Sequence, residues 1–203
     1  MTLVSAAAEA DTPSMRALLW GMVLFAGCAS PTWQVKRSAP QSPIGPAHAI
    51  VVGEPIAGDL KVNGGSEAEF TKGFTVEQQR AWVGLLDIAR RAMVEGLVQH
   101  RGGLQVQRSG APTVELVIEE VVLANQDVHG TPKMMLKALC RLKRIDGSIA
   151  DEIALTSVIE SEAVSQEMIE ATRTRRFQRA GADIGTQAAA YVKDRAGVSA
   201  DAD

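Results

Sequence analysis

The fold is decided by the stretch Met134-Met-Leu-Lys-Ala-Leu-Cys-Arg-Leu-Lys-Arg-Ile-Asp-Gly-Ser-Ile-Ala-Asp-Glu-Ile-Ala-Leu-Thr-Ser-Val-Ile-Glu160. From residue 134 to 142 every second side chain is apolar, and the side chains between them are mixed and partly cationic. This is the pattern of a strand with one buried face. Asp146-Gly147 indicates a tight turn, because this dipeptide tolerates positive φ angles. Residues 149–160 are therefore predicted to form the antiparallel partner strand, with Ile153, Leu155 and Ile159 on one face.

Further strands are predicted before this hairpin. Residues 113–123 form a longer strand in which Val114, Leu116 and Ile118 share a face, until Glu119-Glu120 interrupts the alternation and favours a β-bulge. A short buried strand is expected at residues 49–52, and another near Leu104 and Val106. The Gly-rich stretch between them, up to Gly73, is expected to be a loop.

Two amphipathic helices flank the later strands. Thr75-Val76-Glu77-Gln78 has the spacing of a capping box, so a helix should begin there and end before Gly102-Gly103. A second helix follows Ser165 and ends before Gly197. The apolar stripe of the first helix is Trp82, Leu85, Leu86, Ala89, Met93 and Leu97, and that of the second is Phe177, Ala180, Ile184, Ala188, Tyr191 and Val192.

The order of these elements, β-α-β-β-β-β-α, predicts an α+β fold. We expect a mainly antiparallel sheet of four to five strands, with two helices packed on one face. The domain is predicted to span residues 48–197, with a polar tail over residues 198–203. Gly181 and Gly185 have four-residue spacing, which in such a helix would allow a close approach to the sheet.

The N-terminus is typical of an export signal. Arg16 precedes an apolar run of eleven residues, 17–27, that ends at Cys28. A bilayer core of about 30 Å requires about 20 apolar residues, so this run suits a signal peptide that is removed after export. Residues 1–14 contain no Lys or Arg, and we therefore predict that translation starts at Met15.

The end of this run, Leu24-Phe25-Ala26-Gly27-Cys28, resembles the lipobox of bacterial lipoproteins, although Phe25 departs from the smaller residue usual at its position. The resemblance implies that Cys28 carries the lipid. Ala29, in place of an Asp, implies sorting to the outer membrane, and we expect the protein on the periplasmic face of that membrane. The alternatives are an ordinary secretory signal or a cytosolic chain with an apolar N-terminus. Residues 28–47 contain four prolines and are predicted to be a tether, in which Trp33 docks on the domain or lies at the membrane interface.

The domain is similar to small envelope lipoproteins of the lipopolysaccharide-assembly type and to the periplasmic domain of curli-secretion lipoproteins. It also resembles a poorly characterised lipoprotein group in which a helix leads to a Gly-bounded strand and a meander. The residues that carry this likeness are Gly102-Gly103-Leu104-Gln105-Val106, Ile145-Asp146-Gly147 and the late helix from Ala180 to Val192. None of them is a specific motif, so the resemblance concerns the fold alone.

The sequence offers few residues for chemistry. Lys and Arg number 21 against 24 Asp and Glu, so the charge does not favour nucleic acid. Gly53-Glu-Pro-Ile-Ala-Gly58 has the glycine spacing of a phosphate loop, but Asp59-Leu60 stand where Lys and Ser or Thr would bind phosphate, which argues against a nucleotide. His48, His100 and His129 are too far apart for a local metal motif, so no metal or other cofactor is expected. A metal site formed by residues that are distant in sequence but close in the folded protein remains an alternative.

Three sets of residues in the sequence are candidate sites. Cys140 is expected to be a small buried hydrophobe rather than a nucleophile, since no activating base is identifiable. Glu119-Glu120 and Asp151-Glu152 should be solvated edge charges, because neighbouring strand residues point to opposite faces unless a bulge intervenes. The one basic cluster comprises Arg173, Arg175, Arg176 and Arg179. It could contact lipid headgroups, lipopolysaccharide phosphates or an acidic partner, or simply be a solvated helix face.

These features predict a lipid-anchored, non-enzymatic accessory or scaffold subunit of a bacterial envelope assembly, serving transport, secretion or outer-membrane maintenance. Its expected partners are the membrane, through Cys28, and other envelope proteins. One alternative is a periplasmic module that binds a lipid or glycan between sheet and helices, which an internal apolar cavity would favour. Another is a surface-anchored hydrolase, which would need Asp, Glu or His residues that converge in a cleft.

Overall fold

The computed structural model describes residues 33–124, 133–160 and 169–198. The predicted signal peptide, Cys28, His129 and residues 199–203 of the predicted tail lie outside these residues. The elements in chain order are β1 (Trp33–Arg37), β2 (Ala49–Val52), β3 (Ile56–Val62), β4 (Gly65–Ser66), α1 (Glu67–Thr71), α2 (Val76–Gln99), β5 (Gln105–Gln107), β6 (Thr113–Ala124), β7 (Lys133–Lys143), β8 (Ile149–Glu160) and α3 (Ile169–Ala196).

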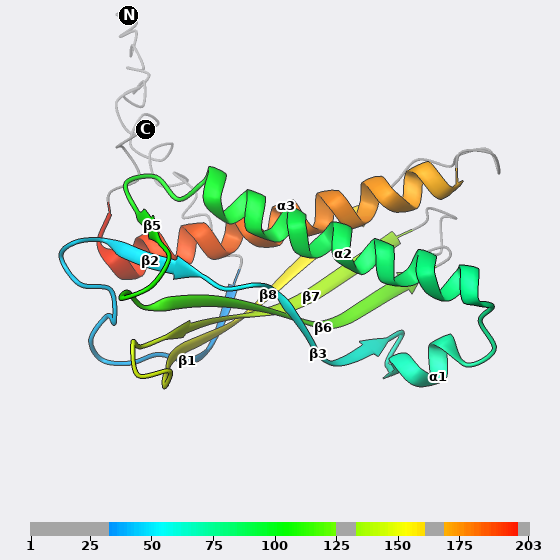
Figure 1. Ribbon diagram of the computed structural model, residues 1–203, viewed down its shortest axis with the longest axis horizontal. Helices are drawn as coiled ribbons and strands as arrows, with labels where there is room; N and C mark the ends of the chain where they lie inside the picture. The colour runs from blue at the N-terminus through cyan, green and yellow to red at the C-terminus, as the bar shows by residue number, and fades with distance from the viewer. Residues whose placement is uncertain (1–32, 125–132, 161–168, 199–203) are drawn as a thin grey trace, which may run out of the picture. The chain divides into compact units, whose positions relative to one another are not determined.

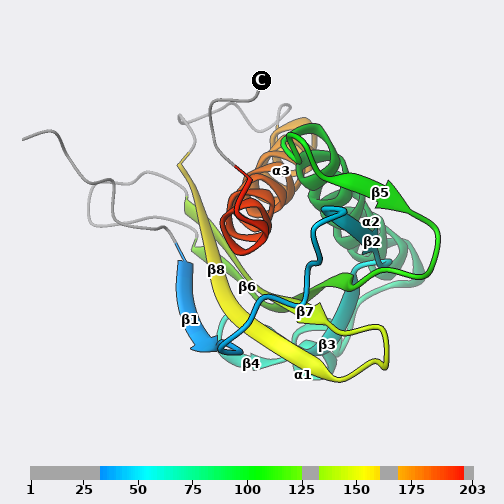
Figure 2. The same cartoon turned by 90° about the vertical axis from the view of Figure 1, so that its left-hand side faces the viewer.

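The strands form one mixed sheet of eight strands in the order β1-β8-β7-β6-β2-β5, with β3 also beside β6 and β4 beside β3. The long strands β6, β7 and β8 are an antiparallel meander, whereas β2 and β3 run parallel to β6. Helices α2 and α3 lie side by side over one face of the sheet (Figures 1 and 2). The predicted α+β class is therefore confirmed, and the sheet is larger than expected because short strands join both of its edges.

The hairpin predicted from the alternating pattern is present. Cys140 pairs with Ile153 and Ala138 with Leu155, so the apolar positions of both strands share the face beneath the helices. The turn contains Gly147 at a φ of 83°, and the backbone N–H of Ser148 donates a hydrogen bond of 2.8 Å to the Asp146 carboxylate. The Asp-Gly signal and the period of two thus predicted both the turn and the faces of the strands.

The helices bury their apolar stripes against the sheet and against each other. Thr75 caps α2, where its hydroxyl accepts from the backbone N–H of Gln78 while the Gln78 side chain accepts from that of Thr75. Trp82 of α2 meets Phe177 of α3 edge to face, with ring centroids 5.9 Å apart. Each fully buried side chain of this size contributes roughly 1.5–3 kcal/mol through the hydrophobic effect.

The glycines of α3 serve a contact other than the one predicted. Gly181 and Gly185 face α2 rather than the sheet, and a Cβ added to them would collide with the backbone oxygens of Ala89 and Met93, respectively. Gly96 of α2 likewise meets the backbone of Ala182. The two helices can therefore approach backbone to backbone, because none of the three contact positions carries a side chain.

Two stretches expected to lack regular structure are partly ordered. The tether predicted over residues 28–47 was wrong for Trp33–Arg37, which forms strand β1 and pairs antiparallel with β8. The prolines that suggested a tether disfavour central strands, but Pro40, Pro43 and Pro46 follow this edge strand and do not interrupt it. The Gly-rich stretch expected to be a loop contains β3, β4 and the short helix α1, whose cap is the Ser66 hydroxyl.

Candidate functional site

The face of the sheet turned away from α2 and α3 carries charged residues in rows. Alternation along the strands directs these side chains outward while their neighbours point into the core. The row on β6 is acidic, the row on β7 is basic, and β8 contributes a further acid. The members of these rows are Glu115, Glu119 and Glu120, then Lys137, Arg141 and Lys143, then Glu152.

Neighbouring rows neutralise one another through short ion pairs. The ammonium group of Lys143 donates to Glu115 at 2.6 Å, and that of Lys137 donates to Glu120 at 2.7 Å. Arg141 donates from Nε to Glu152 at 2.7 Å, and this hydrogen bond raises the pKa of the Arg141 guanidinium. Because these side chains are partly solvated, each pair contributes only about 0.2–1 kcal/mol to stability.

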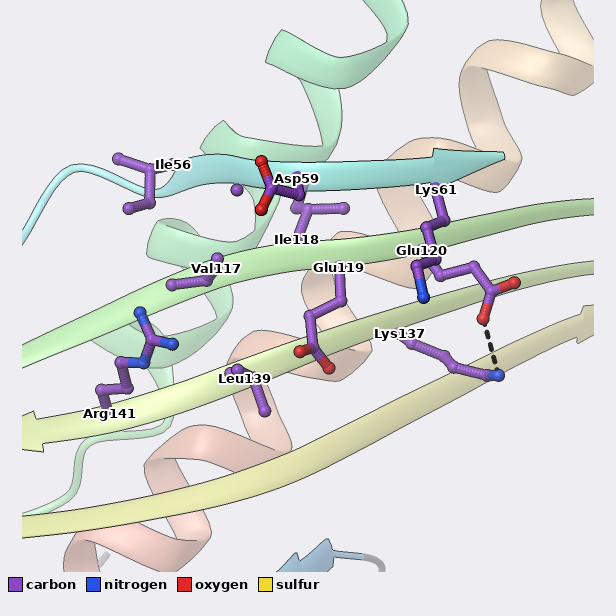
Figure 3. Close-up of a pocket in the computed structure, with 11 residues that line it drawn as sticks. Ile56, Asp59, Lys61, Val117, Ile118, Glu119, Glu120, Lys137, Leu139 and Arg141 are labelled. Atoms are coloured by element: carbon purple, nitrogen blue, oxygen red, sulfur yellow. Dashed lines mark hydrogen bonds and ion pairs between the residues drawn. The ribbon is translucent and has the colours of Figure 1, made fainter. Parts of the chain in front are cut away.

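A β-bulge brings two glutamates onto this face together. The register of β6 against β7 shifts between Ile118 and Glu120, so Glu119 is an extra residue that β7 does not match. Consecutive strand residues would point to opposite faces, but here Glu119 and Glu120 line the same groove (Figure 3). The bulge expected from the interrupted alternation is confirmed. It makes Glu119-Glu120 a convergent pair, which an unbulged strand would have separated.

The groove around this bulge has a volume of about 640 Å³ and lies across β3, β6 and β7 (Figure 3). Strand β3 is irregular at the same level, since its register against β6 shifts between Ala57 and Lys61. Gly58 lines the groove without a side chain, and Asp59 and Lys61 stand along β3 beside it. The glycine spacing that resembled a phosphate loop therefore leads into a strand of this sheet.

Two acids of the groove, Glu119 and Glu120, are paired with neighbouring cations. Glu120 binds Lys137, and Glu119 lies 3.5 Å from the Lys36 ammonium group of β1. Within the described part of the chain, no three His, Cys, Asp or Glu side chains are placed to hold a metal ion. The groove is thus a polar surface in which Glu119 and Glu120 each lie beside a lysine.

Asp151 was expected to be a solvated edge charge, and that prediction was wrong. Its side chain is fully buried on the helix face, whereas Glu152 lies on the opposite face. Arg195 of α3 donates to Asp151 Oδ2 from Nε at 2.8 Å, and the backbone N–H of Ala39 donates to Oδ1 at 2.7 Å. A buried carboxylate is tolerated when a cation and further donors replace the lost water, and here both come from distant parts of the chain.

Cys140 and Tyr191 lie near this buried carboxylate. Burial, with a smaller contribution from the Asp151 charge, raises the pKa of the Cys140 thiol to about 12. The same two causes raise the pKa of the Tyr191 phenol. Cys140 is fully buried, as predicted, and its raised pKa keeps the thiol protonated at neutral pH. A protonated, inaccessible thiol is a poor nucleophile.

The histidines within the described residues do not converge. His100 caps the end of α2, with Nδ1 2.9 Å from the Gly96 carbonyl oxygen. His48 precedes β2 at a φ of 47°. Both therefore lie near element ends.

The basic cluster occupies the first half of α3. Arg173, Arg175 and Arg179 are exposed, and Arg176 is half-buried. Burial and the charge of Arg173 lower the pKa of Arg176. Two statements remain predictions: that this cluster contacts lipid or a partner, and that Cys28 carries a lipid.

The comparisons with known proteins found solved structures that resemble this chain. No protein-family model matches the chain, and no curated protein matches it. A protein of the DUF330 family from Xanthomonas campestris is 14% identical over 81% of this chain and 94% of its own, with a TM-score of 0.44. A PelC dodecamer from Paraburkholderia phytofirmans is 12% identical over 77% and 97% of the two chains, with a TM-score of 0.38. A minor lipoprotein from Acinetobacter baumannii is 12% identical over 71% and 94%, with a TM-score of 0.38. No residue role is carried over from them.

Proposed function

We propose that this protein is a lipid-anchored, non-enzymatic accessory or scaffold subunit of a bacterial envelope assembly. Cys28 would hold it on the periplasmic face of the outer membrane. The observation that carries the proposal is the position of β1, which begins at Trp33 and is part of the sheet. Five residues of extended chain span at most about 18 Å. A lipid on Cys28 would therefore keep the domain at the membrane surface.

The segment that follows β1 is fastened to the domain. The backbone of Ala39 donates to Asp151 at 2.7 Å and accepts from Arg195 at 2.8 Å. Trp33, at the start of β1, packs edge to face on Tyr191 with ring centroids 5.8 Å apart. Trp33, five residues after Cys28, thus packs on α3, and the strand that it begins pairs with β8.

The outer face of the sheet is the surface that we assign to a protein partner. It combines the ion-paired rows with the half-exposed Val158. Mixed surfaces of this kind suit the polar and hydrated interfaces of non-obligate complexes. The space between sheet and helices is filled by core residues such as Met93, Cys140 and Ile184, and this packing does not favour the alternative of a lipid or glycan carrier.

Metabolic labelling with a palmitate analogue tests the anchor. We expect Cys28→Ser to abolish labelling and release the protein from the outer-membrane fraction. Cys140→Ala is the matched control, because this buried thiol should not be acylated. Unchanged labelling and retention of Cys28→Ser would refute the anchor.

Site-specific photo-crosslinking in cells tests the partner surface. A crosslinker at Thr156, which is exposed on the outer face of β8, should give a discrete adduct with an envelope protein. The control position is Val83, which is 48% exposed on α2. Equal adducts at the two positions, or none at Thr156, would contradict the assignment.

A further inference from the structure

The sheet has an unpaired stretch along the edge that β2 and β3 form. Strand β6 pairs with one side of both strands. On the other side, β5 pairs with β2 only as far as Val51, and β4 pairs only with Lys61 and Val62 of β3. Within the described part of the chain, residues 52–60 therefore have no strand on their outer side. At about 3.3 Å per residue, this gap is about 30 Å long.

The gap leaves backbone hydrogen-bonding groups without a partner. Alternate residues of a strand direct their N–H and C=O groups to the same side, so those on the outer side of residues 52–60 belong to no ladder. Among the described residues, no side chain binds the backbone of this segment either. Glu54, Ile56, Gly58 and Asp59 are exposed, so another chain can reach the edge. An accessible row of such groups is a template for a further strand.

Grooves lie on both faces of this edge. Toward α2, a groove of about 720 Å³ is lined by residues 52–55 and by side chains of the helix such as Val94. On the outer face, Ile56, Gly58 and Asp59 line the groove around the β-bulge, and Figure 3 shows β3 as its outermost strand. The side chains of an added strand would alternate between the two faces. Each face therefore has space for them.

The edge itself is mainly acidic. Glu54 and Asp59 are exposed, and within the described residues neither of them has a cation as a partner. Lys61 is the one cation of β3, and it stands where β4 closes the gap. Opposite charges on neighbouring strands stabilise their pairing, so a lysine or arginine on an added strand would be favoured beside Asp59.

The charges of α2 across the groove do not reverse this preference. Asp87 binds Arg90 at 2.9 Å, and Arg91 and Glu95 contribute one charge of each sign. The net charge of the helix side is therefore close to zero. The acids of the edge decide the sign of the partner.

Two features of the edge limit the length of an added strand. Pro55 has no backbone N–H, and the register of β3 against β6 shifts between Ala57 and Lys61. Prolines and bulges at a sheet edge discourage long and unselective pairing. The edge is therefore suited to a short segment.

We propose that residues 52–60 bind a short extended segment of another protein, which adds to the sheet as a strand and places a lysine or arginine beside Asp59. Main-chain hydrogen bonds hold the segment, and its alternate side chains enter the two grooves. This surface is separate from Thr156 on β8, because β6 and β7 lie between β3 and β8. The inference thus goes beyond the partner surface proposed above.

Hydrogen exchange followed by mass spectrometry tests the site with a defined probe. The probe is a six-residue peptide that alternates lysine with valine, blocked at both ends, and the protein is the full chain carrying Cys28→Ser. We expect the peptide to slow amide exchange at residues 52–60. The same peptide N-methylated along its backbone should give no protection, because it has no N–H groups to donate.

A charge reversal tests the predicted pairing. Asp59→Lys should raise the dissociation constant of the fluorescently labelled peptide about fivefold, as measured by anisotropy. Asp194→Lys is the matched control, since it reverses an exposed charge in the last turn of α3 and should leave the constant unchanged. Both side chains are exposed, so the fold should survive.

Several outcomes would overturn the proposal. They are an absence of protection at residues 52–60, equal protection by the N-methylated peptide, and equal weakening in the two charge variants. Protection of this edge without peptide that grows with protein concentration would assign it to a second copy of the chain instead. None of these results bears on palmitate labelling of Cys28 or on the adduct at Thr156, so failure here is distinguishable from failure of the proposed function.

Discussion

Asp151 and Arg195 form a buried ion pair, with 2.8 Å between Asp151 Oδ2 and Arg195 Nε, that joins the start of β8 to the end of α3. Both side chains also bind the backbone of Ala39, so one interaction connects three segments that are far apart in sequence. The exposed fraction of the Asp151 side chain is 0%, which means that loss of either partner would leave an uncompensated group inside the protein.

Removal of Arg195 should therefore be costly. We expect Arg195→Met to lower the free energy of unfolding by about 3–5 kcal/mol, because Asp151 would stay buried without its cation. Urea unfolding followed by circular dichroism measures this change. Arg144→Met, which alters an exposed arginine in the β7–β8 turn, is the control and should change stability by less than about 0.5 kcal/mol. Similar losses in the two variants would argue against the role of the pair.

The contact between α2 and α3 should be sensitive to a single methyl group. Gly185→Ala places a Cβ against the backbone of Met93, and we expect a loss of about 1–3 kcal/mol, because backbone cannot give way as a side chain can. Gly84→Ala is the matched control in α2, where nothing lies within 4 Å of the added Cβ. That variant should gain up to about 1 kcal/mol from helix propensity. Thermal unfolding of both variants measures whether Gly185→Ala lowers stability while Gly84→Ala raises it. A stabilised Gly185→Ala variant would contradict the close contact between α2 and α3.

Alkaline pH should destabilise the protein through Cys140. The folded state holds the thiol proton more tightly than the unfolded state, since its pKa rises from 9.0 to about 12. The stabilisation is complete below the unfolded value and is lost as pH rises from about 9 toward 12. Tyr191, whose pKa is also raised, adds to the same trend. Cys140→Ala should reduce the slope of stability against pH in this window, as measured by urea unfolding at several pH values. An unchanged slope would show that other groups dominate.

The outer face of the sheet should matter for partners more than for stability. Arg141 pairs with Glu152 and lies 3.6 Å from Glu115, and its side chain is 28% exposed. We expect Arg141→Ala to cost at most about 1 kcal/mol of stability and to remove the protein adduct formed by a crosslinker at Thr156. A stable Arg141→Ala variant that keeps the adduct would exclude this part of the face from the interface.

The two glutamates of the candidate site could be anticipated from the sequence, because a β-bulge interrupts the alternation of apolar residues along the strand. The apolar alternation of β6 fails at Glu119-Glu120, and the structure places both glutamates in one groove there. Asp59 and Lys61 of β3 also line the groove, and Lys36 of β1 pairs with its Glu119. The prolines and glycines around these two strands did not suggest strands in the sequence. Their pairing with β8 and β6 depends on distant partners, so no local pattern revealed it.

The sequence by itself determined the β7–β8 hairpin, the two amphipathic helices and the turn at Gly147, because periodicity and turn chemistry act between residues that are close in the chain. Only the tertiary structure decided that Trp33–Arg37 joins the sheet, that Asp151 is buried rather than solvated, and that Gly185 faces α2. Each of these depends on a residue far away in sequence that supplies a hydrogen-bonding edge, a counter-ion or a helix surface. A local pattern contains no information about such a partner until the chain has folded.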